Sequence, residues 1–281
     1  TASCPANTVV LGGGNSFTVG SWEGDGSVSS SYPDGSTEEF AASGFRTAFP
    51  LVGEANTVAA DLFNNTNPDS YLYAYACGGG TYTSEGGVGS SANFATDTVN
   101  AVFTNLFGSY HGDWDYEADP FMPAALASRG GILNTTWAGR PGSYWQSLTY
   151  GESIGYAMKE TQNARFNAGF LPYFGESGMH VSLLGDPSIR AQYLAPATNL
   201  EAVQNCTTIE LNWGDSPEAN LEGYLVYRSS TKNGAYIRLT PNPISAKIYQ
   251  DQGVAAGHYY YMVKAAKKSS TPGGGVYWNN S

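Results

Sequence analysis

Two short motifs hold the side chains best suited to chemistry. The first is Cys77 followed by the glycines 78–80, and the second is the run 108–115, which contains His111. A cysteine attacks as its thiolate, and a nearby imidazole lowers the pKa of the thiol. Backbone N–H groups of the glycine run would offer an oxyanion hole. Cys77 and His111 therefore form a candidate catalytic pair; the alternative is an inert buried thiol and a hydrogen-bonding loop histidine.

Both motifs follow a strand pattern. Residues 70–77 and 101–107 are apolar and rich in aromatic or β-branched side chains, and each run gives way to a glycine-containing loop. A rigid strand aims the loop that follows it. We therefore expect both motifs at strand ends, where chemistry is commonly placed.

The second motif continues into an acidic stretch. Carboxylates stand at every second position, at Asp113, Asp115, Glu117 and Asp119. A dense supply of oxygen ligands in a loop is what calcium prefers, although the stretch lacks the glycine and the terminal glutamate of an EF-hand loop. The pattern leaves two interpretations open, a calcium site and a solvated acidic loop. We expect no other cofactor.

Aromatic side chains follow in the next part of the chain. Trp137, Tyr144, Trp145 and Tyr150 could rim a groove for a peptide or a glycan, because exposed aromatic rings supply contact area. In most proteins such residues pack the core or the sheet edge instead, and we expect that role here.

Composition excludes several classes of function. The chain has 281 residues, long enough for two domains, and 13 Lys+Arg against 24 Asp+Glu give a net charge of −11. A nucleic-acid partner needs a dense basic surface, so none is expected. No apolar run approaches the roughly 18 residues of a membrane span. The 35 Gly and 20 Tyr with only 13% charged residues are typical of proteins outside the cell.

The order of predicted elements indicates two architectures. Residues 1–192 alternate strands with helices, which predicts an α/β fold with a mostly parallel sheet and helices on both faces. Residues 196–281 read as short alternating strands separated by turns, as in an all-β sandwich. The expected strands are 8–11, 70–77, 101–107, 131–137, 200–213, 223–228, 236–239 and 258–266, and the expected helices 37–51, 54–63, 120–127 and 147–163.

Three of the later strands resemble strands B, C and F of a fibronectin type III domain. They are 209–213, which ends in Trp213, then 223–228, and 258–265 with its run of tyrosines. In that family a B-strand tryptophan and an F-strand tyrosine pack the core. The resemblance implies a fibronectin type III-like sandwich over residues 196–281.

Residues 183–190 have the sequence Leu183-Leu184-Gly185-Asp186-Pro187-Ser188-Ile189-Arg190. This run is similar to the Leu-hydrophobic-Gly-Asp-Pro-Ser/Thr-Leu signature near the end of the caspase-like catalytic domain of the gingipain family of secreted bacterial cysteine peptidases. It is the most specific of three matches by which residues 1–192 resemble that domain. The run 130–137 resembles the strand after the nucleophile. The run 108–114 is similar in spacing to the family's Ala-Cys-x-x-Gly-Asp-Phe nucleophile motif.

The departures from the family pattern fall on its catalytic pair. Ser109 stands where the resemblance places the nucleophilic cysteine, and Cys77-Gly78 stands where it places the His-Gly pair of the general base. A serine hydroxyl attacks only when a base takes its proton, and a thiol is a poor base at neutral pH. Ser109 with Cys77 is therefore not a working dyad.

The resemblance implies a secreted or cell-surface bacterial protein whose gingipain-like domain is a pseudoenzyme acting as a binding or structural module. Its partner would be a protein or peptide, a glycan, or another copy of the chain. Such architectures often continue into a sorting domain for type IX secretion, so the chain is expected to be part of a longer protein. The alternatives are an active cysteine peptidase using Cys77 and His111, and a subunit of a self-assembling surface fibre or layer.

Overall fold

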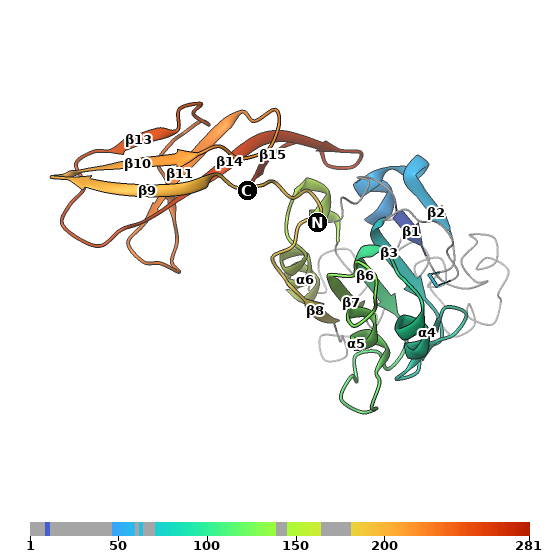
Figure 1. Ribbon diagram of the computed structural model, residues 1–281. Helices are drawn as coiled ribbons and strands as arrows, with labels where there is room; N and C mark the ends of the chain where they lie inside the picture. The colour runs from blue at the N-terminus through green and yellow to red at the C-terminus, as the bar shows by residue number, and fades with distance from the viewer. Residues whose placement is uncertain (1–8, 12–46, 60–61, 64–70, 139–144, 164–180) are drawn as a thin grey trace. The chain divides into compact units, whose positions relative to one another are not determined.

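The computed structural model describes residues 9–11, 47–59, 62–63, 71–138, 145–163 and 181–281 (Figure 1). The chain divides into two units, residues 1–191 with 271–274 and residues 192–270 with 275–281. Each unit is described by itself. Among the described residues, no helix has both the length and the apolar character needed to cross a membrane.

A six-stranded sheet organises the first unit, in the order β2-β1-β3-β6-β7-β8. Neighbouring strands run parallel except for β8, which is antiparallel to β7. The prediction that this sheet is mostly parallel is therefore confirmed. The strands are β1 Val9–Leu11, β2 Thr57–Ala59, β3 Tyr71–Cys77, β6 Ala101–Phe107, β7 Asn134–Ala138 and β8 Val181–Gly185.

Both faces of this sheet are buried, which explains why its central strands are apolar almost throughout rather than alternating. One face packs against helical residues 47–52, the 3-10 helix η2 Gln146–Tyr150 and the helix α6 Ile154–Asn163. The other face packs against the helices α4 Ser91–Thr96 and α5 Phe121–Leu126. Successive residues of a strand point to opposite faces, so β3 places Tyr73 and Tyr75 in one core and Ala74 and Ala76 in the other.

Two expected helices differ from those observed. The helix expected over 54–63 is a single 3-10 turn, η1 Glu54–Asn56, followed by strand β2, because the Thr57-Val58 pair favours extended backbone and pairs with β1. The helix expected over 147–163 is divided into η2 and α6, since Gly151 adopts a left-handed φ of 88° and ends the first piece. Of the helix expected over 37–51, only the end lies within the described residues.

The second unit consists of two antiparallel sheets, a three-stranded one in the order β13-β10-β9 and a four-stranded one in the order β12-β11-β14-β15. The single strand expected over 200–213 is a hairpin of β9 and β10, and β13 and β15 were not expected. The strands are β9 Thr198–Asn205, β10 Thr208–Gly214, β11 Gly223–Ser229, β12 Ile237–Arg238, β13 Ile248–Asp251, β14 Tyr260–Thr271 and β15 Gly275–Asn280.

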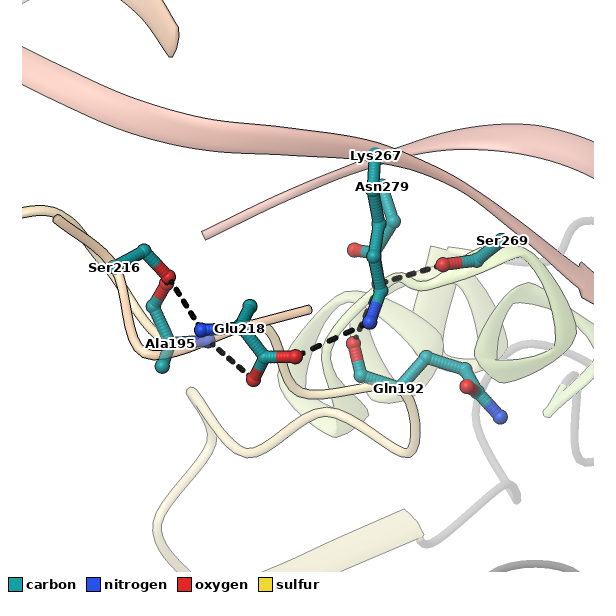
Figure 2. Close-up of polar contacts among 7 residues, drawn as sticks. All are labelled: Gln192, Ala195, Ser216, Glu218, Lys267, Ser269 and Asn279. Atoms are coloured by element: carbon teal, nitrogen blue, oxygen red, sulfur yellow. Dashed lines mark hydrogen bonds and ion pairs between the residues drawn. The ribbon is translucent and has the colours of Figure 1, made fainter. Parts of the chain in front are cut away.

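A polar network holds the first residues of this unit against its strands, as Figure 2 shows. The Glu218 carboxylate accepts a hydrogen bond from the Ala195 N–H at 3.1 Å. It also forms an ion pair with Lys267 Nζ at 3.1 Å. Asn279 on β15 donates to the Gln192 carbonyl at 2.9 Å. The segment before β9 is therefore part of the packed unit rather than a free linker.

Replacing Leu106 by alanine should destabilise the first unit strongly. Leu106 is fully buried on β6, and truncating a buried leucine to alanine costs about 2–5 kcal/mol, since the cavity refills only in part. Urea unfolding followed by tryptophan fluorescence would measure the loss. Leu133→Ala is the matched control, because this leucine is 51% exposed and its loss should change stability by no more than about 0.5 kcal/mol. Equal losses in the two variants would contradict the described core.

Candidate functional site

The two motifs leave the same edge of the sheet. β3 and β6 are parallel neighbours whose registers end together, with Cys77 paired to Phe107. The loops that start at Gly78 and Gly108 are therefore side by side, as the strand-end argument predicts. The first loop contains a small hairpin, β4 Ser84–Glu85 with β5 Gly89–Ser90, before α4.

Glycine allows these loops to touch backbone to backbone. A Cβ atom on Gly80 would lie 2.2 Å from the Ser109 carbonyl oxygen and 2.3 Å from the Ser109 nitrogen. One on Gly78 would lie 2.2 Å from the Gly86 carbonyl oxygen. Any larger residue would push the loops apart. The glycine run thus serves close packing, whatever its N–H groups can bind.

His111 is buried within the second loop, with 1% of its surface exposed. Its Nε2 lies 3.2 Å from the Ser84 carbonyl oxygen on β4, and its ring packs on Phe121 of α5 at 4.9 Å. Gly108 leaves the space the ring needs, since a Cβ there would lie 2.4 Å from His111 Cε1. Nδ1 is buried and makes no hydrogen bond within the described part of the chain.

The surroundings of His111 fix its charge. Burial disfavours the imidazolium and lowers the pKa of His111 to about 4, and the hydrogen bond to Ser84 opposes that shift only in part. The ring is neutral at neutral pH. Because Nε2 faces a carbonyl, it carries the proton, and Nδ1 presents a bare lone pair.

The other two predicted catalytic residues lie at the same edge. Ser109 is exposed, and its hydroxyl makes no hydrogen bond with any described residue, so no described base contacts it. The backbone of Cys77 ends β3, whereas its side chain lies outside what the structure describes. The pairing of Cys77 with His111 therefore stays a prediction.

The structure also brings to this edge Glu85, which was not predicted, and Trp137, which was predicted as a packing or groove residue. Glu85 on β4 has 1% of its surface exposed, and its Cγ would lie 3.1 Å from a Cβ on Gly78, next to Cys77. Trp137 at the end of β7 donates its indole N–H to the Gly108 carbonyl oxygen at 2.7 Å. No local sequence signal separates a buried carboxylate such as Glu85 from an exposed one, because its burial depends on the fold of the hairpin.

The aromatic residues proposed for a groove are divided between core and surface. Trp137 and Trp145 are buried, as expected for packing roles, whereas Tyr150 is 45% exposed. Tyr144 lies outside the described residues. The tryptophans therefore do not rim a groove.

The acidic loop is exposed along its whole length. Asp113, Asp115, Glu117 and Asp119 all face solvent. Across the described residues, no three His, Cys, Asp or Glu side chains gather closely enough to hold a metal ion. The structure adds no support for calcium, which stays a prediction.

Comparisons with solved structures include two likenesses with low TM-scores. No protein-family model matches the chain, and no curated protein matches it. An Fn3-like protein from Clostridium thermocellum is 30% identical over 31% of this chain and 90% of its own, with a TM-score of 0.24. The Arg-specific cysteine proteinase gingipain R is 12% identical over 97% of this chain and 66% of its own, with a TM-score of 0.43. Both TM-scores are too low to assign a family.

Acid should destabilise the protein through His111. The pKa is about 4 in the folded state and about 6.5 in the unfolded chain, so the unfolded chain binds more protons between these values. Stability is then lost as the pH falls from about 6.5 to about 4, by roughly 3 kcal/mol in total. Urea unfolding at pH 7, 6, 5 and 4 would measure this slope.

The variant His111→Gln isolates the contribution of His111 protonation to the loss of stability in acid. Its glutamine amide can still donate to the Ser84 carbonyl but does not titrate. The variant should lose less stability than the parent between pH 7 and pH 4. His258→Gln is the control, since His258 is exposed in the second unit and should leave the slope unchanged. Parallel pH profiles for the parent and His111→Gln would rule out a buried, neutral imidazole.

Proposed function

We propose that the first unit is a gingipain-like, caspase-like domain that does not cleave peptides and acts as a binding or structural module of a secreted or cell-surface protein. The motifs at 108–114, 130–137 and 183–190 support the family, and the first of them follows β6 at the edge where β3 also ends. The departures at positions 77 and 109 support the loss of catalysis. Export through type IX secretion and further domains belong to the same proposal.

The state of His111 is the observation that carries the loss of activity. A general base works best with a pKa near the working pH, whereas the pKa of His111 is about 4. An ordinary thiol has a pKa near 8.5, so transferring its proton to this imidazole costs about 6 kcal/mol. His111 is therefore better suited to fastening the second loop to β4 than to activating a nucleophile.

We also propose that the second unit is a fibronectin type III-like spacer. Its three-stranded and four-stranded sheets enclose a core in which Trp213 of β10 meets Tyr224 of β11 edge-on at 5.7 Å. Of the tyrosines in the run that resembles strand F, Tyr261 on β14 packs against that core. Its hydroxyl also donates to Asp251 at 2.7 Å, a residue that pairs with Arg228. These contacts join the two sheets, as a rigid spacer needs.

A second candidate function has one observation in its favour. The buried Nδ1 of His111 has no partner among the described residues, and a free ring nitrogen is what a thiol would need nearby. An active cysteine peptidase using Cys77 and His111 is therefore the rival, with a clear chemical signature.

Labelling with a thiol-reactive peptide probe between pH 5 and pH 8 separates the two functions. The test uses a Cys206→Ser background, because Cys206 is an exposed free thiol that would react on its own. We expect no labelling that depends on Cys77 with an acidic pKa, and no cleavage of a mixed peptide library. The readout is intact mass after each incubation.

Cys77→Ala and His111→Gln are the matched variants. Labelling at low pH that disappears in both of them, together with peptide cleavage by the parent, would overturn the non-catalytic proposal. Labelling that rises only above about pH 8 and is the same in the parent and in His111→Gln would be the behaviour of an ordinary thiol. That result would support the non-catalytic proposal.

A further inference from the structure

The two parts of the chain differ in charge. Residues 1–191 contain 6 Lys+Arg and 18 Asp+Glu, whereas residues 192–281 contain 7 and 6. The first part is therefore strongly acidic and the second is close to neutral, with a slight basic excess. No Lys or Arg occurs between Arg46 and Arg129, the stretch that includes the strand-end loops. Such an asymmetry predicts that contacts between copies would join unlike parts.

An acidic aromatic patch covers the strand-end loops of the first unit. The ring of Tyr82 stacks on Tyr116 at 4.4 Å and lies 5.1 Å from Tyr110, and these two partners are 69% and 52% exposed. Trp114, in the same loop, is 49% exposed. Exposed rings that gather in one place mark an interaction surface more often than scattered ones do. The patch consists of Tyr82, Tyr110, Trp114 and Tyr116 with Asp113, Asp115, Glu117 and Asp119.

The carboxylates of this patch have no cationic partner in the described part of the chain. None of the four forms an ion pair with a described residue, and all four are exposed. Partial burial raises the pKa of Tyr82, and the nearby Tyr116, Asp113, Tyr110 and Glu117 add to the rise, which places acids beside the rings. The surface thus combines stacked aromatic rings with uncompensated negative charge, and a cationic surface would complement both.

A basic face with matching chemistry lies on the four-stranded sheet of the second unit. Tyr224, Val226, Val263 and Ala265 point into the core, so the alternate residues of β11 and β14 point outward. The register pairs Leu225 with Lys264, and Tyr227 with both Met262 and Arg238, which puts these side chains on one face of the sheet, with Leu225 itself only 4% exposed. The basic face consists of Arg238, Lys264 and Lys268 with Val276 and Trp278.

This face is exposed at its edge, and the outward positions of its strands hold no acidic residue. Val276 is 73% and Trp278 49% exposed, and Lys268 Nζ lies 5.5 Å from the Trp278 ring centroid. Arg238 and Lys268 form no ion pair with a described residue. None of the outward positions of β11, β12, β14 and β15 holds Asp or Glu. An apolar, cationic surface of this kind fits the acidic aromatic patch.

We propose that the acidic aromatic patch of one copy binds the basic face of the second unit of another copy. A chain with a net charge of −11 repels itself unless surfaces of opposite sign meet, and these two surfaces do so. Because the contact joins unlike surfaces, it is heterologous and propagates into open chains or closed rings. The inference gives the proposed binding role a partner and rests on that role.

Sedimentation velocity of the full chain tests the assembly. At about 50 mM salt the average mass should rise with protein concentration, and at about 500 mM salt it should fall back toward one copy, because exposed charges are screened beyond a few ångströms there. A wild-type chain that stays a single copy at every concentration would overturn the proposal. An assembly whose average mass is the same at both salt concentrations would overturn it as well.

Two sets of variants identify the surfaces. The patch variant is Asp113→Asn with Asp115→Asn and Tyr116→Ala, and the face variant is Arg238→Gln with Lys268→Gln. Each should remain a single copy, whereas a mixture of the two should form complexes of two copies and no larger, since each variant keeps one good surface. Glu201→Gln and Lys232→Gln, both exposed and outside the two surfaces, are the matched controls and should assemble like the parent.

Other outcomes decide against the inference. If the patch variant assembles normally, the patch is not the contact. If the parent stays a single copy yet binds polylysine through the patch, the partner is a different basic chain and the inference is wrong. Thermal unfolding of each variant confirms that it is folded. Peptide cleavage is measured separately, so failure of the assembly and failure of the non-catalytic proposal can be distinguished.

Discussion

The parallel pairing of β3 with β6 is the constraint on which the first unit depends. It ends both strands at the same level, so the two glycine-containing loops must leave the sheet together. Gly80 then lies directly on the backbone of Ser109, an approach that no residue with a Cβ allows. The sheet and the loops are therefore one packed body. Both faces of the sheet must be covered for that body to persist, which is the role of the helices.

The same packing sets the chemistry available at the strand ends. Anchoring the second loop through His111 to the Ser84 carbonyl removes the imidazole from water, and this burial lowers the pKa of His111. A histidine that must stay neutral to be buried is a weak base. Stability of the loop and strength of the base thus oppose each other at this residue, and the structure favours stability. Trp137 further stabilises the same loop, because its indole N–H donates a hydrogen bond to the Gly108 carbonyl oxygen.

Exposed features divide differently from buried ones. The buried residues of the two units form separate apolar cores. The net charge differs between the two parts of the chain, because acidic residues predominate in the first and basic residues slightly in the second. The loops that follow β3 and β6 also hold stacked tyrosines and exposed acids. One set of loops therefore holds both the candidate catalytic residues and this exposed surface.

The sequence by itself determined the alternation of strands and helices, the position of both motifs at strand ends and the change to antiparallel strands near residue 196. These follow from local patterns, namely apolar runs, glycines and turn residues, which act over a few residues. Sequence reasoning was wrong where two local preferences competed, as at Thr57–Ala59, where pairing with β1 selected a strand, and at Gly151, where a left-handed turn divided a helix.

Only the tertiary structure decided the state of the site. The burial of His111 and Glu85, the contact of Gly80 with Ser109 and the stacking of Tyr82 on Tyr116 each join residues that are distant in the chain. The pKa of an imidazole depends on the solvent and charges around it, and these are fixed by packing and not by sequence neighbours. The residue types at positions 77, 109 and 111 could therefore be read from the sequence, whereas the neutral, weakly basic state of His111 follows from the fold.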